Sequence, residues 1–165
     1  MAIQMEVRRT DPVEYHQLWQ LFHETIHQVN SADYSQEQLN AWSPEEYQSL
    51  PWETRMRKID PIVAVVDGTI VGFSDLQTDG LIDMFYVHHQ WQRQGVGRLL
   101  MDEINRLAFQ LTLHTLHSYV SITAMPFFER HGFSVVRAQQ VEVRGLRLQN
   151  FLMQKQLVDQ SLPRR

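Results

Sequence analysis

Two glycines in a short polar segment are the residues of this chain best suited to binding chemistry. The segment reads Gln92-Arg93-Gln94-Gly95-Val96-Gly97 and lies between an apolar run that ends at Val87 and a helical pattern that begins at Val96. Because glycine has no Cβ, the backbone there can approach a ligand closely. The first N–H groups of a helix have no intrahelical partner and, together with the helix dipole, attract anions. The segment therefore predicts a site for the phosphates of a cofactor.

Two familiar phosphate-binding motifs do not fit this segment. A Walker loop ends in Gly-Lys-Ser or Gly-Lys-Thr, whereas Gly97 is followed by Arg98 and Leu99. The dinucleotide-binding fingerprint requires a third glycine, and its position holds Leu100. The predicted phosphate site therefore belongs to another class of protein.

The elements that must position this segment follow from the spacing of the apolar residues. In the first half of the chain, alternation predicts a strand, helical spacing predicts a helix that starts at Asp11-Pro12, and capping-box sequences at Ser35 and Ser43 predict short helices. A β-branched run over 62–66 predicts a strand buried on both faces. The other elements are a strand over 3–8, a helix from 12 to 29, short helices that end near 42 and 50, and one more turn from 51.

The second half of the chain supplies the elements around the glycine segment. Turns at Asp67-Gly68 and Asp79-Gly80 separate antiparallel strands, and one apolar stripe marks the helix after the glycines. The predicted elements are strands over 69–76, 81–87 and 116–122, helices over 96–111 and 126–130, and a hairpin of 134–143 with 146–154. The order is β-α-α-β-β-β-α-β-α-β-β, an α/β fold with a mixed (α+β) sheet. We expect one domain over 1–155 and a loose tail over 156–165.

Composition narrows the class of protein further. Lys and Arg number 15 against 19 Asp and Glu, which argues against nucleic acid or an anionic membrane surface as a partner. The absence of cysteine excludes disulfides, cysteine nucleophiles and thiolate metal sites. The sequence contains neither a signal peptide nor an apolar run long enough to span a membrane. We therefore expect a soluble, cytoplasmic protein.

Four motifs in a fixed order resemble the GNAT superfamily of acetyl-CoA-dependent N-acetyltransferases. Gln-x-x-Gly-x-Gly at 92–97 resembles the pyrophosphate-binding motif of that family, and 67–73 resembles the hairpin between its second and third strands. Phe85-Tyr86-Val87 resembles the end of its fourth strand, and 124–133 resembles its late helix with the Gly-Phe pair that opens the sixth strand. The Phe-Phe-Glu-Arg form of that helix and the segment 35–42 are similar to the YafP-like bacterial branch.

The resemblance implies a GNAT-like domain that moves an acetyl group from acetyl-CoA to a primary amine, by direct attack in a ternary complex. The amine would belong to a small molecule or a peptide. In the family a backbone N–H near the end of the fourth strand faces the thioester oxygen, which is oxyanion-type stabilisation. The cofactor-binding residues that the resemblance implies are Phe85, Tyr86, Val87, Gln92, Arg93, Gln94, Gly95, Val96, Gly97, Arg98, Ser121 and Phe128.

Asp83 and Tyr119 are the residues expected to act as general base and general acid. Asp83 lies in an otherwise apolar strand, and Asp75, at the end of the preceding strand, is the second candidate for the base. An arginine partner would instead make Asp83 a structural carboxylate. Many members of the family place a tyrosine as the acid where this chain has Phe128. Either Tyr119 or Tyr86 substitutes, or no acid is needed, because a thiol has a pKa of only ~8.5.

Two alternatives stay open on the sequence alone. His23-Glu24-Thr25-Ile26-His27 matches His-Glu-x-x-His, which on a helix places two histidines on one face for zinc, with the glutamate as the base of a metalloprotease. That interpretation needs a third ligand and leaves the glycine segment unexplained, so we expect no metal. The other alternative is a module that binds CoA without catalysis, which the missing tyrosine favours. The final hairpin also offers an edge through which two copies could pair as a homodimer.

Overall fold

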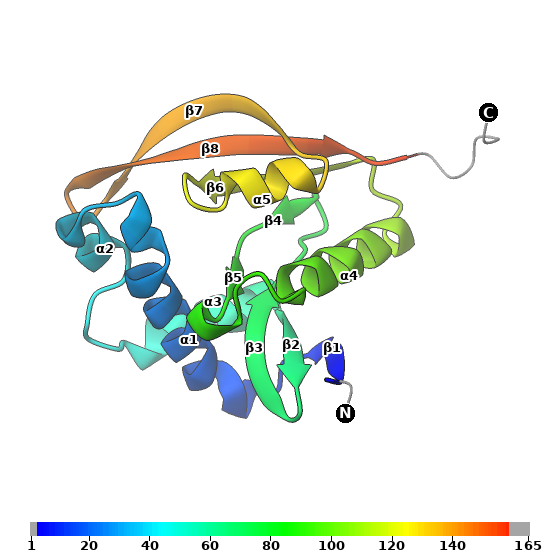
Figure 1. The fold of residues 1–165 in the computed structure, drawn as a ribbon, viewed down its shortest axis with the longest axis horizontal. Helices are drawn as coiled ribbons and strands as arrows, with labels where there is room; N and C mark the ends of the chain where they lie inside the picture. Colours follow the sequence, from blue (N-terminus) through cyan, green and yellow to red (C-terminus); the bar gives the residue numbers. More distant parts are fainter. Residues whose placement is uncertain (1–2, 159–165) are drawn as a thin grey trace.

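The computed structural model describes residues 3–158 and builds them around two four-stranded sheets (Figure 1). The first sheet has the strand order β1-β2-β3-β5, and the second has the order β4-β6-β8-β7. The strands are β1 (Met5–Arg9), β2 (Ile62–Val66), β3 (Thr69–Ser74), β4 (Leu81–Ile82), β5 (Phe85–Val87), β6 (Thr115–Ser121), β7 (Ser134–Val143) and β8 (Leu146–Gln156). The helices are α1 (Tyr15–Gln28), α2 (Gln36–Trp42), α3 (Ser49–Ile59), α4 (Val96–Gln110) and α5 (Met125–Arg130), with short 3-10 helices η1 (Pro12–Glu14), η2 (Asn30–Ala32) and η3 (His89–Trp91).

Helices cover both faces of the first sheet, which explains the continuous apolar sequence of β2. Every residue of β2 is buried. Val63 and Val65 pack in one core cluster with residues of α1 and α3, whereas Ala64 and Val66 pack in another with residues of α4. The prediction of a strand buried on both faces is confirmed. The same packing holds α4 against the sheet that carries β5.

The predicted strand over 81–87 is instead two strands that belong to different sheets. β4 pairs in parallel with β6, whereas β5 pairs antiparallel with β3 (Figure 1). Asp83 and Met84 lie between them, and the carboxylate of Asp75 accepts hydrogen bonds from both of their N–H groups. The prediction of one strand was wrong because this side chain takes backbone donors that a continuous sheet would have used.

The helices before β2 differ from the prediction at the second capping box. Ser35 caps α2 as predicted, since its hydroxyl accepts a hydrogen bond from the N–H of Gln38 at 3.2 Å. Ser43 begins no helix, because its hydroxyl is bonded to Nδ1 of His23 at 2.6 Å. The next helix is α3, and it contains the predicted extra turn from residue 51.

The final hairpin forms β7 and β8 and is longer than predicted. β8 runs to Gln156, and the N–H of Leu157 donates to the carbonyl of His114 at 2.8 Å. The predicted loose tail falls mostly on residues 159–165, which lie outside the described residues. Within residues 3–158, every helix is too short or too polar to span a lipid bilayer.

Candidate active site

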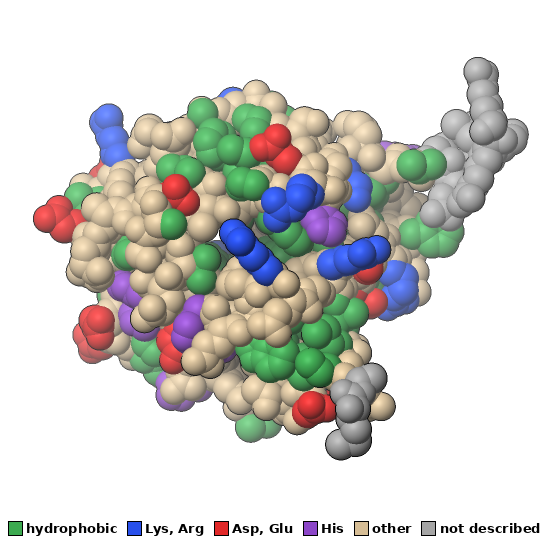
Figure 2. Space-filling view, viewed as in Figure 1, with side chains coloured by type: hydrophobic (Ala, Val, Ile, Leu, Met, Phe, Trp, Pro, Cys, Tyr) green, Lys and Arg blue, Asp and Glu red, His purple; other side chains and the backbone are tan. Residues whose placement is uncertain are grey.

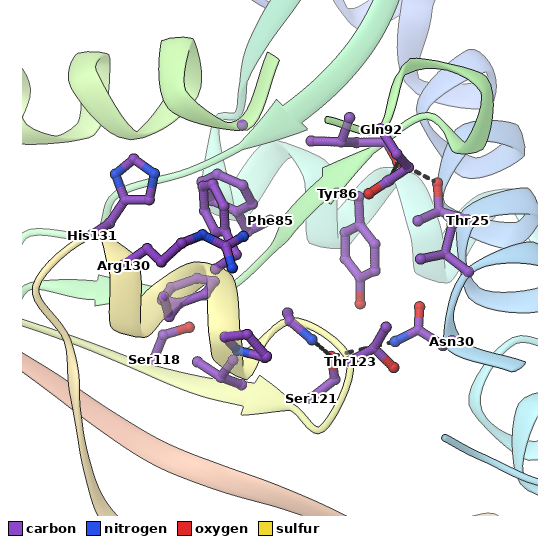
Figure 3. Close-up of a pocket in the computed structure, with 18 of the residues that line it drawn as sticks. Thr25, Asn30, Phe85, Tyr86, Gln92, Ser118, Ser121, Thr123, Arg130 and His131 are labelled. Carbon is purple, nitrogen blue, oxygen red and sulfur yellow. Dashed lines mark hydrogen bonds between the residues drawn. The ribbon is translucent and has the colours of Figure 1, made fainter. Parts of the chain in front are cut away.

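A cavity of about 750 Å³ opens where β5 and β6 separate (Figure 3). Its walls come from β5, the glycine segment with the start of α4, the end of β6, and α5 with the turn before it. Residues of α1 and η2, together with Trp42 of α2, complete the lining. This volume lies in the range of clefts that hold a cofactor or a small-molecule ligand. The cavity therefore joins the glycine segment to the divergence of the two sheets.

The backbone of β5 turns polar groups toward this cavity. β5 is the last strand of the first sheet, so within the described residues it pairs only with β3. The carbonyl of Val87 accepts hydrogen bonds from Oγ1 of Thr25 at 3.1 Å and from Nε2 of Gln92 at 2.7 Å. The N–H of His88 points the other way, toward β3. Because successive residues of a strand direct their backbone groups to opposite sides, the N–H groups of Phe85 and Val87 face the cavity.

α4 begins at the cavity with uncapped N–H groups. Its N-cap is Gly95, which has a φ of 90° and no side chain to bond those groups. A Cβ on Gly95 would meet nothing within 4 Å, so the space in front of the helix is open. A Cβ on Gly97 would lie 2.9 Å from Cε2 of Phe127, so α5 packs closely against this end of α4. The two glycines leave an open helix terminus of the kind that binds anions.

Most side chains that the sequence assigns to the cofactor line the cavity. Gln94 and Val96 are exceptions, since the amide of Gln94 donates to the carbonyl of Gln90 at 3.2 Å and Val96 is buried in the core. Neither side chain lies in the lining of the cavity. The assigned residues in the lining are Phe85, Tyr86, Val87, Gln92, Arg93, Gly95, Gly97, Arg98, Ser121 and Phe128.

Arginine side chains gather at the cavity beside the start of α4. Arg93 and Arg98 come from the glycine segment and α4, and Arg130 and His131 come from the end of α5. Figure 2 shows basic side chains and a histidine between the places that α5 and α4 occupy in Figure 1. Burial, and then the charge of Lys155, lowers the pKa of His131, so the arginines carry the positive charge at neutral pH. This side of the cavity suits phosphate groups.

Asp83 lines the cavity and is also one half of an ion pair. Nη2 of Arg55 lies 3.2 Å from Oδ2 of Asp83, and the two side chains are 47% and 31% exposed. The arginine partner is consistent with a structural role for Asp83. Its place in the cavity lining is consistent with the role of a base. Ion pairs this exposed contribute little stability, so the pair is compatible with either role. The role of base remains a prediction.

Asp75, the second candidate base, is buried outside the cavity lining. Its Oδ1 accepts a hydrogen bond from the N–H of Met84 at 2.7 Å, and its Oδ2 accepts one from the N–H of Asp83 at 3.2 Å. Burial raises the pKa of Asp75 to about 6, and the hydrogen bonds oppose that rise. Since both oxygens bind the backbone, Asp75 is placed to fix residues 83–84 and not to take a proton from a ligand.

Three aromatic residues at the cavity are relevant to the choice of general acid. Tyr119 lines the cavity and is 51% exposed. The side chain of Tyr86 extends into the cavity (Figure 3), and burial raises its pKa, so it keeps its proton. Phe128 is buried, with its ring centroid 5.0 Å from that of Phe133 and 5.5 Å from that of Phe85. Phe128 is thus part of the core as well as of the wall, and the two tyrosines are the phenols within reach of the cavity in the described residues.

Three polar residues of the lining were missed by the sequence analysis (Figure 3). Thr25 and Asn30 are buried, and Nδ2 of Asn30 donates to Oγ of Ser121 at 3.3 Å. Oγ1 of Thr123 is also buried and has no hydrogen-bond partner among residues 3–158. The signal for Thr25 was its place beside Ile26 on the apolar face of a helix. A polar residue on such a face needs a partner or a ligand.

The His-Glu-x-x-His segment lies on α1, but its histidines are bonded to the connection between α2 and α3. Nδ1 of His23 lies 2.6 Å from Oγ of Ser43, and Nε2 of His27 lies 2.8 Å from the carbonyl oxygen of Ser43. Because a carbonyl only accepts, Nε2 of His27 carries a proton and has no free lone pair for a metal. This geometry does not support the zinc protease.

Glu24 faces a different pair of histidines. Its Oε2 lies 3.6 Å from Nε2 of His88 and 3.8 Å from Nδ1 of His89, and these are the residues that could together hold a metal within the described chain. The N–H of Gln90 donates to Nδ1 of His88 at 3.1 Å. Neutral His88 therefore carries its proton on Nε2, the nitrogen that would have to bind the metal. His89, the third member, has a buried Nδ1 with no hydrogen-bond partner among residues 3–158, so the protonation argument applies to His88 alone.

Metal removal is expected to leave the protein folded and active, because His23 and His27 are bonded to Ser43 and the proton of His88 lies on Nε2. The measurement is elemental analysis of the purified protein, with activity recorded before and after dialysis against EDTA. One tightly held zinc per chain, lost together with activity, would contradict this expectation and restore the metalloprotease alternative.

Comparison with known proteins agrees with this geometry. Residues 30–157 match the family described as "Acetyltransferase (GNAT) domain". A protein of Escherichia coli (strain K12) named "Uncharacterized N-acetyltransferase YafP" is 32% identical over 149 residues, which cover 90% of this chain and 94% of that protein. The crystal structure of a GCN5-related N-acetyltransferase from Rhodopseudomonas palustris has a TM-score of 0.89 and 28% identity, covering 95% of this chain and 99% of that chain. The PaiA N-acetyltransferase of Thermoplasma acidophilum, solved with coenzyme A, has a TM-score of 0.72 and 19% identity, covering 93% and 99%.

Proposed function

Since the chain belongs to the GNAT acetyltransferase family, we propose that it transfers the acetyl group of acetyl-CoA to a primary amine by direct attack in a ternary complex. The observation that carries this proposal is the slot between β5 and β6, which opens toward the uncapped start of α4. A ligand with an anionic end and a thioester end fits a cavity with those two features.

The donor would lie with its pyrophosphate at Gly95 and Gly97 and its thioester beside β5. The open helix terminus and the arginines support the first placement, because N–H groups and guanidinium groups are strong donors to phosphate. The inward N–H groups of Phe85 and Val87 support the second. They would bind the thioester oxygen and stabilise the negative charge that it gains during attack.

In the proposed reaction the neutral amine nitrogen attacks the thioester carbonyl carbon. A carbon–nitrogen bond forms, the carbon–sulfur bond breaks, and CoA leaves as a thiolate. Asp83 would take the proton from the amine, directly or through a water molecule. Tyr119 would return a proton to the sulfur, with Tyr86 as the other phenol at the cavity.

The acceptor is proposed to carry a positive charge when free in solution. Asp83 is the one carboxylate among the described residues of the lining. Trp42 and Tyr86 contribute aromatic surface to the same lining, and both groups favour a cationic amine.

A CoA-binding module without catalysis is the second candidate. The observation that favours it is Phe128, which cannot donate a proton where many relatives have a tyrosine. A thiol-release assay with acetyl-CoA and a panel of amines separates the two functions. The panel should include a polyamine, an aminoglycoside, amino acids and a peptide with a free N-terminus. We expect thiol release that depends on one class of amine. Tight CoA binding without release for any amine would favour the module, and no CoA binding would overturn both.

A further inference from the structure

We propose that Asp75, Ser74 and Ser118 act together as positioning residues that hold β5 away from β6 and so keep the donor slot open. The effect on donor binding rests on the proposed function, whereas the hydrogen bonds themselves do not depend on any reaction. These three residues form a clamp of side chains around the break between β4 and β5.

The first part of the clamp is the carboxylate of Asp75, which binds the break from the end of β3. It accepts hydrogen bonds from the N–H groups of both intervening residues, Asp83 at 3.2 Å and Met84 at 2.7 Å. Nε2 of Gln77 donates to the same carboxylate at 2.6 Å. Asp75 is 0% exposed, so these hydrogen bonds offset the free-energy cost of burying its carboxylate.

The second part consists of two serine hydroxyls, one bound to the carbonyl of the last residue of β4 and the other to a carbonyl within the break. Oγ of Ser74 donates to the carbonyl of Met84 at 2.6 Å, and Oγ of Ser118 donates to the carbonyl of Ile82 at 2.7 Å. Both serines are buried. With Asp75 they satisfy backbone groups that would otherwise need a neighbouring strand, since unpaired buried backbone groups are costly.

The register of the second sheet shows what the clamp prevents. Leu81 lies opposite His117 and Ile82 lies opposite Ser118 in the parallel pair of β4 and β6. If the same pairing continued, Phe85 would lie opposite Ser121, and the strands would close over the cavity that both residues line. The side chains of the clamp bond to backbone N–H and carbonyl groups of residues 82–84, so these groups cannot continue the pairing with β6. It therefore leaves the N–H groups of β5 free to face the slot.

The clamp requires the ionised form of Asp75, because a protonated carboxyl has one fewer acceptor site for the two N–H groups. Burial is the main cause that raises the pKa of Asp75 to about 6, and the nearby charge of Asp83 adds to it. The hydrogen bonds from Gln77, Met84 and Asp83 lower the pKa. The three hydrogen-bond donors therefore favour the ionised form of Asp75 against the effect of its burial.

Asp75→Asn is the direct test, because an amide keeps one acceptor and turns an N–H group toward the second backbone donor. Ser74→Ala and Ser118→Ala each remove one donor with less disturbance. Asp67→Asn is the matched control, since it removes an aspartate charge in the turn between β2 and β3, where the φ of 48° suits asparagine. The readouts are amide hydrogen exchange at residues 83–84, CoA affinity by calorimetry, and steady-state constants for both substrates.

We expect Asp75→Asn to speed exchange at residues 83–84 and to weaken CoA binding by ~10-fold or more, as for a lost buried hydrogen bond. The KM for acetyl-CoA should rise more than the KM for the amine. A general loss of stability would instead change both KM values to a similar extent. Each serine variant should show the same pattern to a smaller degree, and Asp67→Asn should match the wild type.

Wild-type exchange and CoA affinity in Asp75→Asn would overturn the clamp. If Asp75→Asn does not fold, the serine variants decide, and wild-type CoA affinity in both would overturn the proposal. Failure of the wild-type protein to bind CoA would instead overturn the proposed function. In that case the exchange rates still test the clamp by themselves.

Discussion

Gly95→Asp is expected to abolish acetyl-CoA binding, with a loss of at least ~10²-fold in affinity from charge repulsion alone. Gly95 is the N-cap of α4, and a Cβ there meets nothing within 4 Å, so the new carboxylate enters space that the proposed pyrophosphate occupies. Calorimetric titration with CoA and with acetyl-CoA measures the effect. A side chain at the φ of 90° of Gly95 is strained, although aspartate tolerates a positive φ better than most residues, so circular dichroism and a melting curve check that the variant is folded.

Gly95→Asn is the matched control for this prediction. Asparagine has nearly the size of aspartate, and both residues tolerate a positive φ such as the 90° of Gly95 better than most others. The difference between the two variants therefore reports the charge next to phosphate. We expect the asparagine variant to lose affinity through bulk, but clearly less than the aspartate variant. Equal affinities in the two variants would show that no phosphate group lies at this helix terminus.

The glycine segment and its neighbours could be predicted from the sequence because their determinants are local. The segment 92–97 needs only the strand before it and the helix after it, and both are marked by apolar spacing. The buried strand β2 and the capping box at Ser35 are local in the same sense. These elements account for the order of the fold and for the side of the cavity where the pyrophosphate is proposed to bind.

The break between β4 and β5 could not be predicted, because the side chains that bind it come from other elements. The apolar pattern of 81–87 is that of one strand, whereas Asp75 and Ser118 approach the break from other elements. The ion pair between Arg55 and Asp83 joins α3 to the same break and is equally invisible to periodicity. Local patterns also misled where tertiary contacts decide, since Ser43 binds α1 histidines and caps no helix.

Asp83→Asn is expected to retain acetyl-CoA binding but to lose turnover by ~10²–10⁴-fold, the usual contribution of a general base. Asp83 lines the cavity, whereas the proposed pyrophosphate site lies at Gly95 and Gly97, so the donor should still bind. Free alkylamines have pKa values near ~10.4, so few are neutral at pH 7. The loss should shrink as the pH rises, because more of the acceptor is then already neutral and needs no base.

Arg55→Gln separates the two roles that remain for Asp83. It removes the guanidinium 3.2 Å from Oδ2 of Asp83 but leaves the carboxylate in the cavity. If Asp83 is the base, Arg55→Gln should keep most of the turnover that Asp83→Asn loses. If Asp83 only holds Arg55, the two variants should lose the same small amount, since a half-exposed ion pair is worth little. Wild-type turnover by Asp83→Asn across the pH profile would show that the proton leaves the amine by another route. Because Asp75 is bonded to the backbone through both oxygens, that route would be through water and not through Asp75.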